Sequence, residues 1–519
     1  MKNHQTFLLI LGMFTSSIFA QTPTRVDKGF GDPNETSICI NKKAPHQLVG
    51  GSNIDFIYHS TDSGKNWNEY TAESELGIYG DPVLVSSDFG RVYYAHLSRN
   101  PEKNYPNWFD KIVLQYSDDG GKTFSEGASI GYSLDKMQDK PWINIDHHLS
   151  SPYKNRVFVS WTQFDVYHSA DPSHKSNIKV SFSTDSGASF KYSTIISDIS
   201  GGCLDDDNST EGATTASLPN GTVCAVWGAF GKIWFDKSKD GGVNWGKDKI
   251  LVEQVEGWDM DIDQIYRTNG MPFLACDASG GKNNGRLYLF YGDKKHGDAD
   301  EWLMWSDNGG DTWTEPIRIN TDLAGNGRDQ FMGHFVLDWK TGDWYSIFYD
   351  RRHANGSKEL DVSLSWSAGD TIFNQRLTPN SFSSPGKTKF FGDYIGVDAH
   401  NNFIVPLWTE HHGDLQLFTL PINREKLQPT SNNYLPLYSE IKNKTLLIHY
   451  TNGLKGSITL TNKKLLFIKT KKVIKIDGIA NKKDTYSLSI KPTKNLVITV
   501  DVSVPGTSYL EQTKYSFAK

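Results

Sequence analysis

The order of apolar and polar residues along the chain predicts β-strands almost throughout. Short segments such as 112–116 and 178–182 alternate between apolar and polar side chains. A period of two is typical of strands with one buried face. Four such segments lie between one copy of a repeated turn and the next, from residue 36 to residue 419. This repetition of one four-stranded unit predicts an all-β chain arranged as a β-propeller.

A turn motif, Ser-x-Asp-x-Gly-x-x-aromatic, marks one hairpin in each of five units. The first copy runs from Ser60 to Trp67, and a worn copy lies between Ser365 and Phe373. We expect the Asp carboxylate to accept backbone N–H groups and the Gly to adopt a positive φ. The later copies start at Ser117, Ser183, Ser238 and Ser306. Counted from Ser60, successive copies are 57, 66, 55 and 68 residues apart. The fifth copy has Asn308 in place of the aspartate.

The number of units favours seven blades. Seven unit starts can be recognised, but the seventh unit shows only three clear strands, which end at 415–419. Residues 24–27 near the N-terminus could supply the missing strand and close the ring. A six-bladed propeller with an irregular end is the main alternative.

The N-terminus predicts export. Lys2 precedes an apolar run at 7–14, and small residues follow up to Ala20. This is the layout of a secretory signal peptide, here 1–20, with cleavage after Ala20. The run is shorter than the roughly 20 apolar residues that span a bilayer. We therefore expect a secreted, periplasmic or cell-surface protein with no transmembrane segment.

Charge and composition divide the chain in two. The whole chain has a net charge of −6, but residues 426–519 contain 16 Lys and no Arg against five acidic residues. We therefore predict a propeller at 21–427, followed by a small basic β-sandwich at 433–519. Its lysines could bind an anionic polysaccharide or protect edge strands. The four cysteines are too few for a disulfide scaffold. Cys203 and Cys224 could pair, or all four could be buried as small apolar groups.

The repeated turns resemble the Asp-box motif of sialidases and of the wider Asp-box propeller superfamily. The resemblance covers about residues 30–425. It implies a propeller in which these turns are structural and lie at the outside of the blades. The superfamily includes sialidases, other glycoside hydrolases and non-catalytic binding proteins, and some polysaccharide lyases are also propellers. The fold alone does not choose among these functions.

Topology separates the loops into two faces. Links between blades and loops between second and third strands lie on one face, while the motif turns lie on the other. The first face has the long, charged loops, so we expect the site there. Further charged residues of this face, without an assigned role, are Glu35, Arg99, Asp139, Lys140, Asp165, Asp205, Asp206, Asp207, Asp293, Lys294, Lys295, Asp350 and Glu410. Predicted substrate-binding residues are Arg267, Arg328, Arg351, Arg352, Asp81, Asp329, Asp393, Tyr167 and His168. His147 and His148 fall on the opposite face, so no metal is predicted there.

The resemblance also implies catalytic roles. Tyr394 would be the nucleophile, Glu211 would activate it, and Asp55 would be the acid. A Tyr nucleophile suits the anionic anomeric centre of sialic acid. The family's N-terminal Arg motif is absent at 34–38, and Trp227–Gly228 replace the Arg expected after Glu211. A clamp of three arginines would therefore come from Arg267, Arg328 and the Arg351–Arg352 pair.

Three functions follow from these residues. The first is a sialidase-like glycoside hydrolase acting on an acidic glycan. The second is a lyase of a uronic-acid-containing polymer, with Tyr167 or Tyr394, His168 and an Arg. The third is a non-catalytic glycan- or protein-binding propeller. We expect a glycan or acidic polysaccharide as partner, no nucleic acid, a monomer and no cofactor. A structural calcium ion at Asp205–Asp207 is the alternative to a plain acidic loop.

Overall fold

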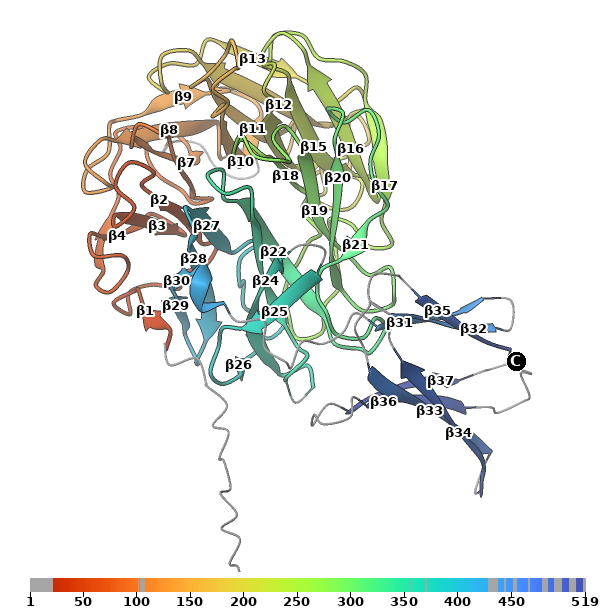
Figure 1. Cartoon of the computed structure of the whole chain (residues 1–519). Coiled ribbons are helices and arrows are strands. Elements are labelled where there is room, and N and C mark those ends of the chain that lie inside the picture. The colour runs from red at the N-terminus through yellow and green to blue at the C-terminus, as the bar shows by residue number, and fades with distance from the viewer. Residues whose placement is uncertain are drawn as a thin grey trace, which may run out of the picture.

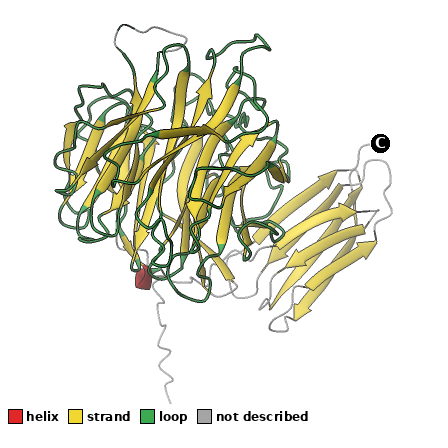
Figure 2. Ribbon diagram, turned by 90° about the horizontal axis from the view of Figure 1, so that it is seen from above, coloured by secondary structure: helices red, strands yellow, loops and turns green. Residues whose placement is uncertain are grey.

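The computed structural model describes residues 22–427, except 101, 103–107, 355 and 369–370, and the backbone of seven strands between 437 and 516. The predicted signal peptide and the centre of the worn turn motif lie outside the described residues. Strands and loops make up nearly all of the described chain, and its one helix is a single 3-10 turn at Arg424–Lys426 (Figure 2). The predicted all-β class is confirmed.

Seven antiparallel sheets form the blades of the propeller (Figure 1). In six of them the four blade strands follow chain order, and in the seventh the N-terminal strand is the outermost. The first strands are β2 (Ser37–Ile40), β6 (Val83–Ser86), β10 (Met137–Ile145), β14 (Glu211–Ser217), β18 (Phe273–Cys276), β22 (Gln330–Leu337) and β27 (Gly396–His400). The second strands are β3 (Leu48–Ser52), β7 (Val92–Ser98), β11 (Val157–Phe164), β15 (Val223–Ala229), β19 (Leu287–Asp293), β23 (Trp344–Asp350) and β28 (Phe403–His411).

The outer half of each blade completes the pattern. The third strands are β4 (Phe56–Ser60), β8 (Lys111–Ser117), β12 (Ser176–Ser183), β16 (Lys232–Ser238), β20 (Asp300–Ser306), β24 (Glu359–Ala368) and β29 (Leu415–Thr419). The fourth strands are β5 (Asn68–Thr71), β9 (Ala128–Ile130), β13 (Tyr192–Ile195), β17 (Lys249–Glu253), β21 (Ile317–Arg318), β25 (Thr371–Arg376) and β1 (Thr24–Arg25). Short strands β26 (Phe382–Ser383) and β30 (Ile422–Asn423) pair with β24 and β28.

The N-terminal strand closes the ring. β1 pairs with β29, with Thr24 opposite Thr419 and Arg25 opposite Phe418. The Asp27 carboxylate then accepts the N–H of Leu417 at 2.7 Å. This strand supplies the fourth strand of the last blade, so the seven-bladed prediction is confirmed and the six-bladed alternative is wrong.

The core lies between neighbouring blades. First strands of adjacent blades contact one another around the axis, from β2 against β6 to β27 against β2. One apolar cluster, for example, joins Val83 and Tyr93 of the second blade to Ile143 and Trp161 of the third. Because both faces of each sheet pack on a neighbour, the inner strands are buried almost along their whole length. Burial of this apolar area is the main stabilising contribution.

Each turn motif forms the hydrogen bonds that its residue types predict. In the first copy the Ser60 hydroxyl accepts the Gly64 N–H at 2.9 Å, and Asp62 accepts the N–H groups of Lys65 and Asn66 at 3.0 and 2.9 Å. The Ser-to-Gly bond has the same length in the other four copies. The motif glycine has a φ between 81° and 97° in all five copies.

The motif glycines also lie against the preceding blade. A Cβ on Gly310 would come within 2.2 Å of the Phe235 ring, and one on Gly242 would meet Phe158 at 3.0 Å. Glycine is therefore required twice, by its positive φ and by the close approach of the neighbouring blade. The motif fastens successive blades together at the face opposite the predicted site.

The four cysteines and the C-terminal strands complete the description. All four cysteines are free, so the pairing of Cys203 with Cys224 is not formed. Among the described residues, no helix has the length and apolar character needed to cross a membrane. Beyond residue 427, one sheet holds β31 (Leu437–Lys442), β32 (Thr445–Tyr450) and β35 (Asp484–Ser489). The other holds β34 (Phe467–Asp477), β33 (Lys455–Lys464), β36 (Val497–Ser503) and β37 (Leu510–Ser516). A sandwich of these two sheets stays a prediction.

We predict that Ser238→Ala destabilises the propeller by about 1–3 kcal/mol, because it leaves the buried N–H of Gly242 without its acceptor. Urea unfolding followed by tryptophan fluorescence measures the change. Asp240→Asn is the matched control, since Asn308 already accepts the Thr312 N–H at 2.9 Å in the fifth copy. We expect this control to cost less than about 0.5 kcal/mol. Equal losses in both variants would contradict the role given to the serine.

Candidate functional site

The residues that open the first strands turn towards the propeller axis through an unusual backbone. Glu35, Asp81 and Lys140 precede or open the first strands of blades one, two and three, and have φ values of 50°, 53° and 50°. A bulge in the pairing of β10 with β11 follows Asp139. Left-handed conformations at non-glycine residues cost about 1–3 kcal/mol and cluster at functional sites. The blade links therefore hold strained, charged residues around one point.

Lys140 is the centre of this cluster. Its ammonium group bonds the carboxylate of Asp393 and lies 3.4 Å from Glu35 Oε1 and 3.7 Å from Asp81 Oδ2. Its side chain is only 6% exposed. The three carboxyl groups come from the links that lead into blades seven, one and two. A buried cation at this point thus joins four blades through charge.

Arg267 extends the cluster towards solvent. Its Nε donates to Asp393 Oδ1 at 2.8 Å and its Nη1 to Asp205 Oδ2 at 3.1 Å, and Nη2 also bonds Asp393. The same oxygen of Asp205 accepts the Tyr167 hydroxyl at 2.8 Å, and its other oxygen accepts the Trp258 indole N–H at 3.0 Å. The Arg267 side chain is 29% exposed, so the cluster is open on this side.

The cluster separates the protonation states of its carboxyl groups. Burial raises the pKa of Glu35 to about 8 and the pKa values of Asp81 and Asp139 to about 6. Burial acts on Asp393 as well, but Arg267 and Lys140 outweigh it and lower the pKa of that group below its usual range. Near neutral pH the cluster thus contains both protonated and ionised carboxyl groups. That combination is what acid–base catalysis requires.

Four of the predicted substrate-binding residues, Asp81, Asp393, Arg267 and Tyr167, belong to this cluster. His168 adjoins it, because its ring stacks on Tyr167 with centroids 4.0 Å apart. These residues are distant in the chain, and the inter-blade links and second-to-third-strand loops bring them together on the face where they were expected.

The predicted catalytic tyrosine forms the floor of the cluster. Tyr394 is 3% exposed, and its hydroxyl donates to the carbonyl of Pro82 at 3.3 Å. Its ring meets Trp142 edge-on at 5.6 Å. Burial raises the pKa of the phenol well above its usual range, and the charges of Glu35 and Asp81 raise it further. The phenol therefore stays protonated.

Glu211 and Asp55 lie differently. Glu211 is fully buried, and one of its oxygens accepts the Thr162 hydroxyl at 3.1 Å. Burial and the charges of Asp205 and Asp139 raise the pKa of Glu211 well above its usual range. Asp55 lies in the β3–β4 turn, and among the described contacts its carboxylate makes none to the cluster. Asn53, from the same turn, donates to Glu35 and accepts the Asp81 N–H at 2.9 Å.

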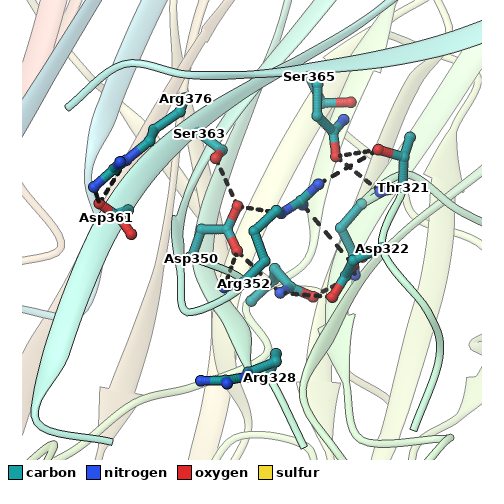
Figure 3. A network of polar contacts seen from close by, with 12 residues as sticks. Thr321, Asp322, Arg328, Asp350, Arg352, Asp361, Ser363, Ser365 and Arg376 are labelled. Atoms are coloured by element: carbon teal, nitrogen blue, oxygen red, sulfur yellow. Dashed lines mark hydrogen bonds and ion pairs between the residues drawn. The ribbon is translucent and has the colours of Figure 1, made fainter. Parts of the chain in front are cut away.

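The other predicted arginines lie in the fifth and sixth blades. Arg351 pairs with Asp329 at 2.9 Å, and the Arg328 guanidinium donates to the Ala354 carbonyl at 2.8 Å. Figure 3 shows Arg352 between Asp350, at 2.6 Å, and Asp322, at 3.9 Å. Of the four arginines proposed for a clamp, Arg267 alone contacts the central cluster in the described part of the chain.

Sequence reasoning placed Glu35, Asp139, Lys140 and Asp205 on the correct face but gave them no role. A usable signal was present. Glu35, Asp139 and Lys140 lie within three residues of Ser37 and Trp142, inside or just ahead of a first strand. First strands of neighbouring blades contact one another around the axis, so residues at their starts are brought close together. Asn53 and Trp258 had no comparable signal.

The described residues include no group of three or more His, Cys, Asp or Glu side chains that could hold a metal ion. Asp205 is engaged by Arg267 and Tyr167, and Asp207 accepts the N–H of Asp259 at 3.0 Å. On the opposite face, His148 Nε2 bonds the Ser217 carbonyl oxygen at 2.8 Å and the His147 ring stacks on Trp339.

A narrow channel of about 200 Å³ follows the first strands along the axis. Trp142 and His334 line its inner end, and Lys42, His147 and Trp339 line the end near the motif turns. Trp142 also contacts Tyr394, so aromatic rings separate the channel from the charged cluster. The cluster is thus reached from its own face.

No family model matches the chain. Among solved structures, the chain is similar to a Hadza microbial sialidase, at 16% identity over 62% of this chain and 63% of that one, with a TM-score of 0.41. It thus spans under two thirds of that protein's length. It is also similar to a sialidase from Streptococcus pneumoniae, at 10% identity over 78% and 95% (TM-score 0.44), and to an ulvan lyase, at 10% over 78% and 96% (TM-score 0.45).

We predict that Glu35 makes the folded state less stable as the pH rises. Its folded pKa of about 8 lies above the ordinary 4.5, so the folded state holds the proton more tightly. The unfolding free energy should therefore fall from about pH 4.5 to about pH 8. Glu35→Gln removes this part of the fall. The unfolding free energy of the variant minus that of the parent should therefore rise by on the order of 1–3 kcal/mol between pH 5 and pH 8. Urea unfolding of both proteins at pH 5 and at pH 8 measures this difference. A difference in unfolding free energy that does not change with pH would contradict the prediction.

Proposed function

We propose that this chain is a glycoside hydrolase whose acid–base chemistry is performed by Asp81 and Asp139. The observation that carries the proposal is that both carboxyl groups lie at Lys140: Asp81 Oδ2 is 3.7 Å from its ammonium group, and Asp139 Oδ1 accepts its backbone N–H at 2.9 Å. Both have a pKa near 6, and the charge of Asp139 contributes to the raised pKa of Asp81. Because both pKa values lie near 6, one carboxyl group can serve in its protonated form and the other in its ionised form at a weakly acidic pH. This is the arrangement that glycoside hydrolysis uses.

The reaction divides between the two groups. The protonated carboxyl gives its proton to the glycosidic oxygen as the bond from that oxygen to the anomeric carbon breaks. The ionised carboxylate takes a proton from a water molecule whose oxygen bonds to the anomeric carbon. Lys140 and Arg267 hold Asp393 ionised and in place, which fixes the links that position the pair.

The sialidase-type roles of Tyr394, Glu211 and Asp55 are the alternative within the same reaction class. The charges that act most on the Tyr394 phenol are those of Glu35, Asp81, Lys140 and Asp393. A buried phenol that donates to a carbonyl is poorly prepared to attack, so we assign attack to water. We also propose that the protein acts outside the cytoplasm, as a monomer, after cleavage behind Ala20.

A specific contact favours a lyase as the second candidate. Tyr167 and His168 stack together, and Tyr167 shares Asp205 with Arg267. In a uronate polymer, Arg267 would neutralise the carboxylate while Tyr167 or His168 moved the proton. Lyase products absorb in the ultraviolet through a new double bond, whereas hydrolase products do not. Reading absorbance and reducing ends together on the same reaction therefore separates the two candidates.

We predict a bell-shaped pH profile of kcat/KM with its maximum near pH 6, because one carboxyl must be protonated and the other ionised. Asp81→Asn and Asp139→Asn should each lower kcat by about 10²–10⁴-fold and each remove one limb of the profile. Initial rates on a glycan panel, read as reducing ends from pH 4 to pH 9, test this. Asp307→Asn, in a motif turn of the opposite face, is the control. It should change neither kcat nor the shape of the pH profile. Full activity in Asp81→Asn would refute the proposed pair.

We further predict that Tyr394→Phe keeps kcat within about tenfold of the parent, since it removes one hydrogen bond to Pro82 and no reacting group. Glu211→Gln should behave similarly. The same reducing-end assay measures both variants. Loss of activity in Tyr394→Phe by more than about a thousandfold, with the unfolding midpoint unchanged, would instead establish the tyrosine as nucleophile.

A further inference from the structure

The cations of the central cluster are already paired within the protein. Lys140 bonds Asp393 and lies near Glu35 and Asp81, and Arg267 divides its N–H groups between Asp393 and Asp205. A carboxylate on the substrate is bound best by an Arg that presents two free N–H groups in its plane. Arg267 offers one edge at most, because Nε, Nη1 and Nη2 each have a partner in the protein.

The rim beside Arg267 carries further negative charge. Asp206 and Asp207 follow Asp205 in the chain, and Asp259 contacts Asp207 through its backbone N–H. Burial and then the charges of Asp207, Asp206 and Asp205 raise the pKa of Asp259. The nearby lysines do not compensate, since Lys294 pairs with Glu256 at 2.8 Å and Lys387 pairs with Asp261.

One further arginine belongs to this face. Arg99, in the loop between β7 and β8, lies over the ring of Tyr79, with its central guanidinium carbon 4.5 Å from the ring centroid. The described contacts connect it with neither Lys140 nor Arg267. The cluster itself contains two cations and six carboxyl groups, of which Asp205 and Asp393 bond Arg267 directly. The six carboxyl groups belong to Glu35, Asp81, Asp139, Asp205, Glu211 and Asp393.

An exposed aromatic ring lies beside the open side of the cluster. Tyr266 is 54% exposed and directly precedes Arg267. Its ring meets Phe390 edge-on, and Arg267 lies over Phe390 at 5.2 Å. The segment is held in place, because the Gly386 N–H donates to the Gln264 carbonyl at 3.0 Å. A large aromatic ring that is exposed yet fixed next to a polar site is typical of a ligand-binding surface.

We propose that the central face binds an uncharged sugar residue, and that the ring of Tyr266 is the surface on which the apolar face of that sugar stacks. This inference rests on the proposed glycoside hydrolase function and names its substrate class. It replaces the acidic glycan predicted from the sequence.

The charges explain the choice. A substrate carboxylate would enter a site whose two cations are already engaged, and would meet the carboxylates of Asp205 and Asp393 beside the Arg267 guanidinium. The hydroxyl groups of a neutral sugar can instead donate to those carboxylates and accept from the remaining N–H groups of Arg267. A carboxyl pair also suits an uncharged anomeric centre, whereas a tyrosine nucleophile suits an anionic one.

Matched substrates test the charge. The purified full chain is assayed on two matched pairs of 4-nitrophenyl glycosides, in both anomers: the glucoside with the glucuronide, and the galactoside with the galacturonide. A 4-nitrophenyl sialoside is assayed beside them. We expect kcat/KM to be at least about tenfold higher for the neutral member of a pair, with the difference shrinking as salt is added. Equal or faster turnover of the anionic member, or turnover of the sialoside alone, would overturn the inference.

Variants test the ring. Tyr266→Ala should raise KM about tenfold with kcat within about twofold, because it removes binding that ground state and transition state share. Tyr266→Phe should retain the parent KM. Tyr192→Ala, at an exposed tyrosine on the outer strand β13, is the matched control and should change nothing. An unchanged KM in Tyr266→Ala would overturn the stacking surface while leaving the hydrolase proposal standing.

Binding separates failure of this inference from failure of the proposed function. Calorimetry with neutral and uronate oligosaccharides of the same linkage needs no turnover. If no substrate is cleaved but neutral oligosaccharides bind and Tyr266→Ala weakens them, the inference stands and the hydrolase proposal falls. If uronate oligosaccharides bind more tightly, or if Tyr266→Ala binds as well as the parent, the inference falls.

Discussion

The ion pair between Lys140 and Asp393 is the interaction on which the centre of this propeller depends. Placing an ammonium group where its side chain is 6% exposed costs several kcal/mol unless carboxylates surround it. Here Asp393 supplies the direct contact, while Glu35 and Asp81 supply longer-range charge. Since these groups come from links into different blades, the ring must be closed before the lysine is neutralised. The charge is therefore compensated only in the complete fold.

The two faces of the molecule divide the work of folding and chemistry. At the motif face, serine, aspartate and glycine satisfy their own turn and press each blade against the one before. That face needs little from distant parts of the chain. On the other face, strained residues such as Asp81 and Lys140 satisfy one another only across blades. Regular, locally stable turns thus support an irregular site, which is how strain can persist at a functional position.

Much of the fold could be predicted because its causes are local. Alternation identified the strands, the motif identified one hairpin per blade, and topology separated the faces. The closing strand was also predictable, since the last unit lacked a strand and Thr24–Arg25 was available. The contacts within the site could not be predicted in this way. A sequence repeat does not predict that Asp393 contacts Lys140, 253 residues away in the chain. It also does not predict that Arg351 pairs with Asp329 and lies apart from Arg267.

The chemistry that we propose differs from the one that the resemblance implies, and the contacts of Tyr394 and Arg267 are the reason. The resemblance implies a nucleophile at Tyr394, but its hydroxyl donates to the Pro82 carbonyl, and the charges of Glu35 and Asp81 act on its phenol. An arginine that would receive a substrate carboxylate instead holds Asp393 and Asp205. When the cations of a site are paired with its own carboxylates, they attract a substrate anion less strongly. The carboxyl groups that burial keeps protonated can then act as proton donors. On the function proposed above, the seven blades bind a neutral sugar because of the charges that the closed ring brings together, since a propeller fold by itself does not decide the chemistry.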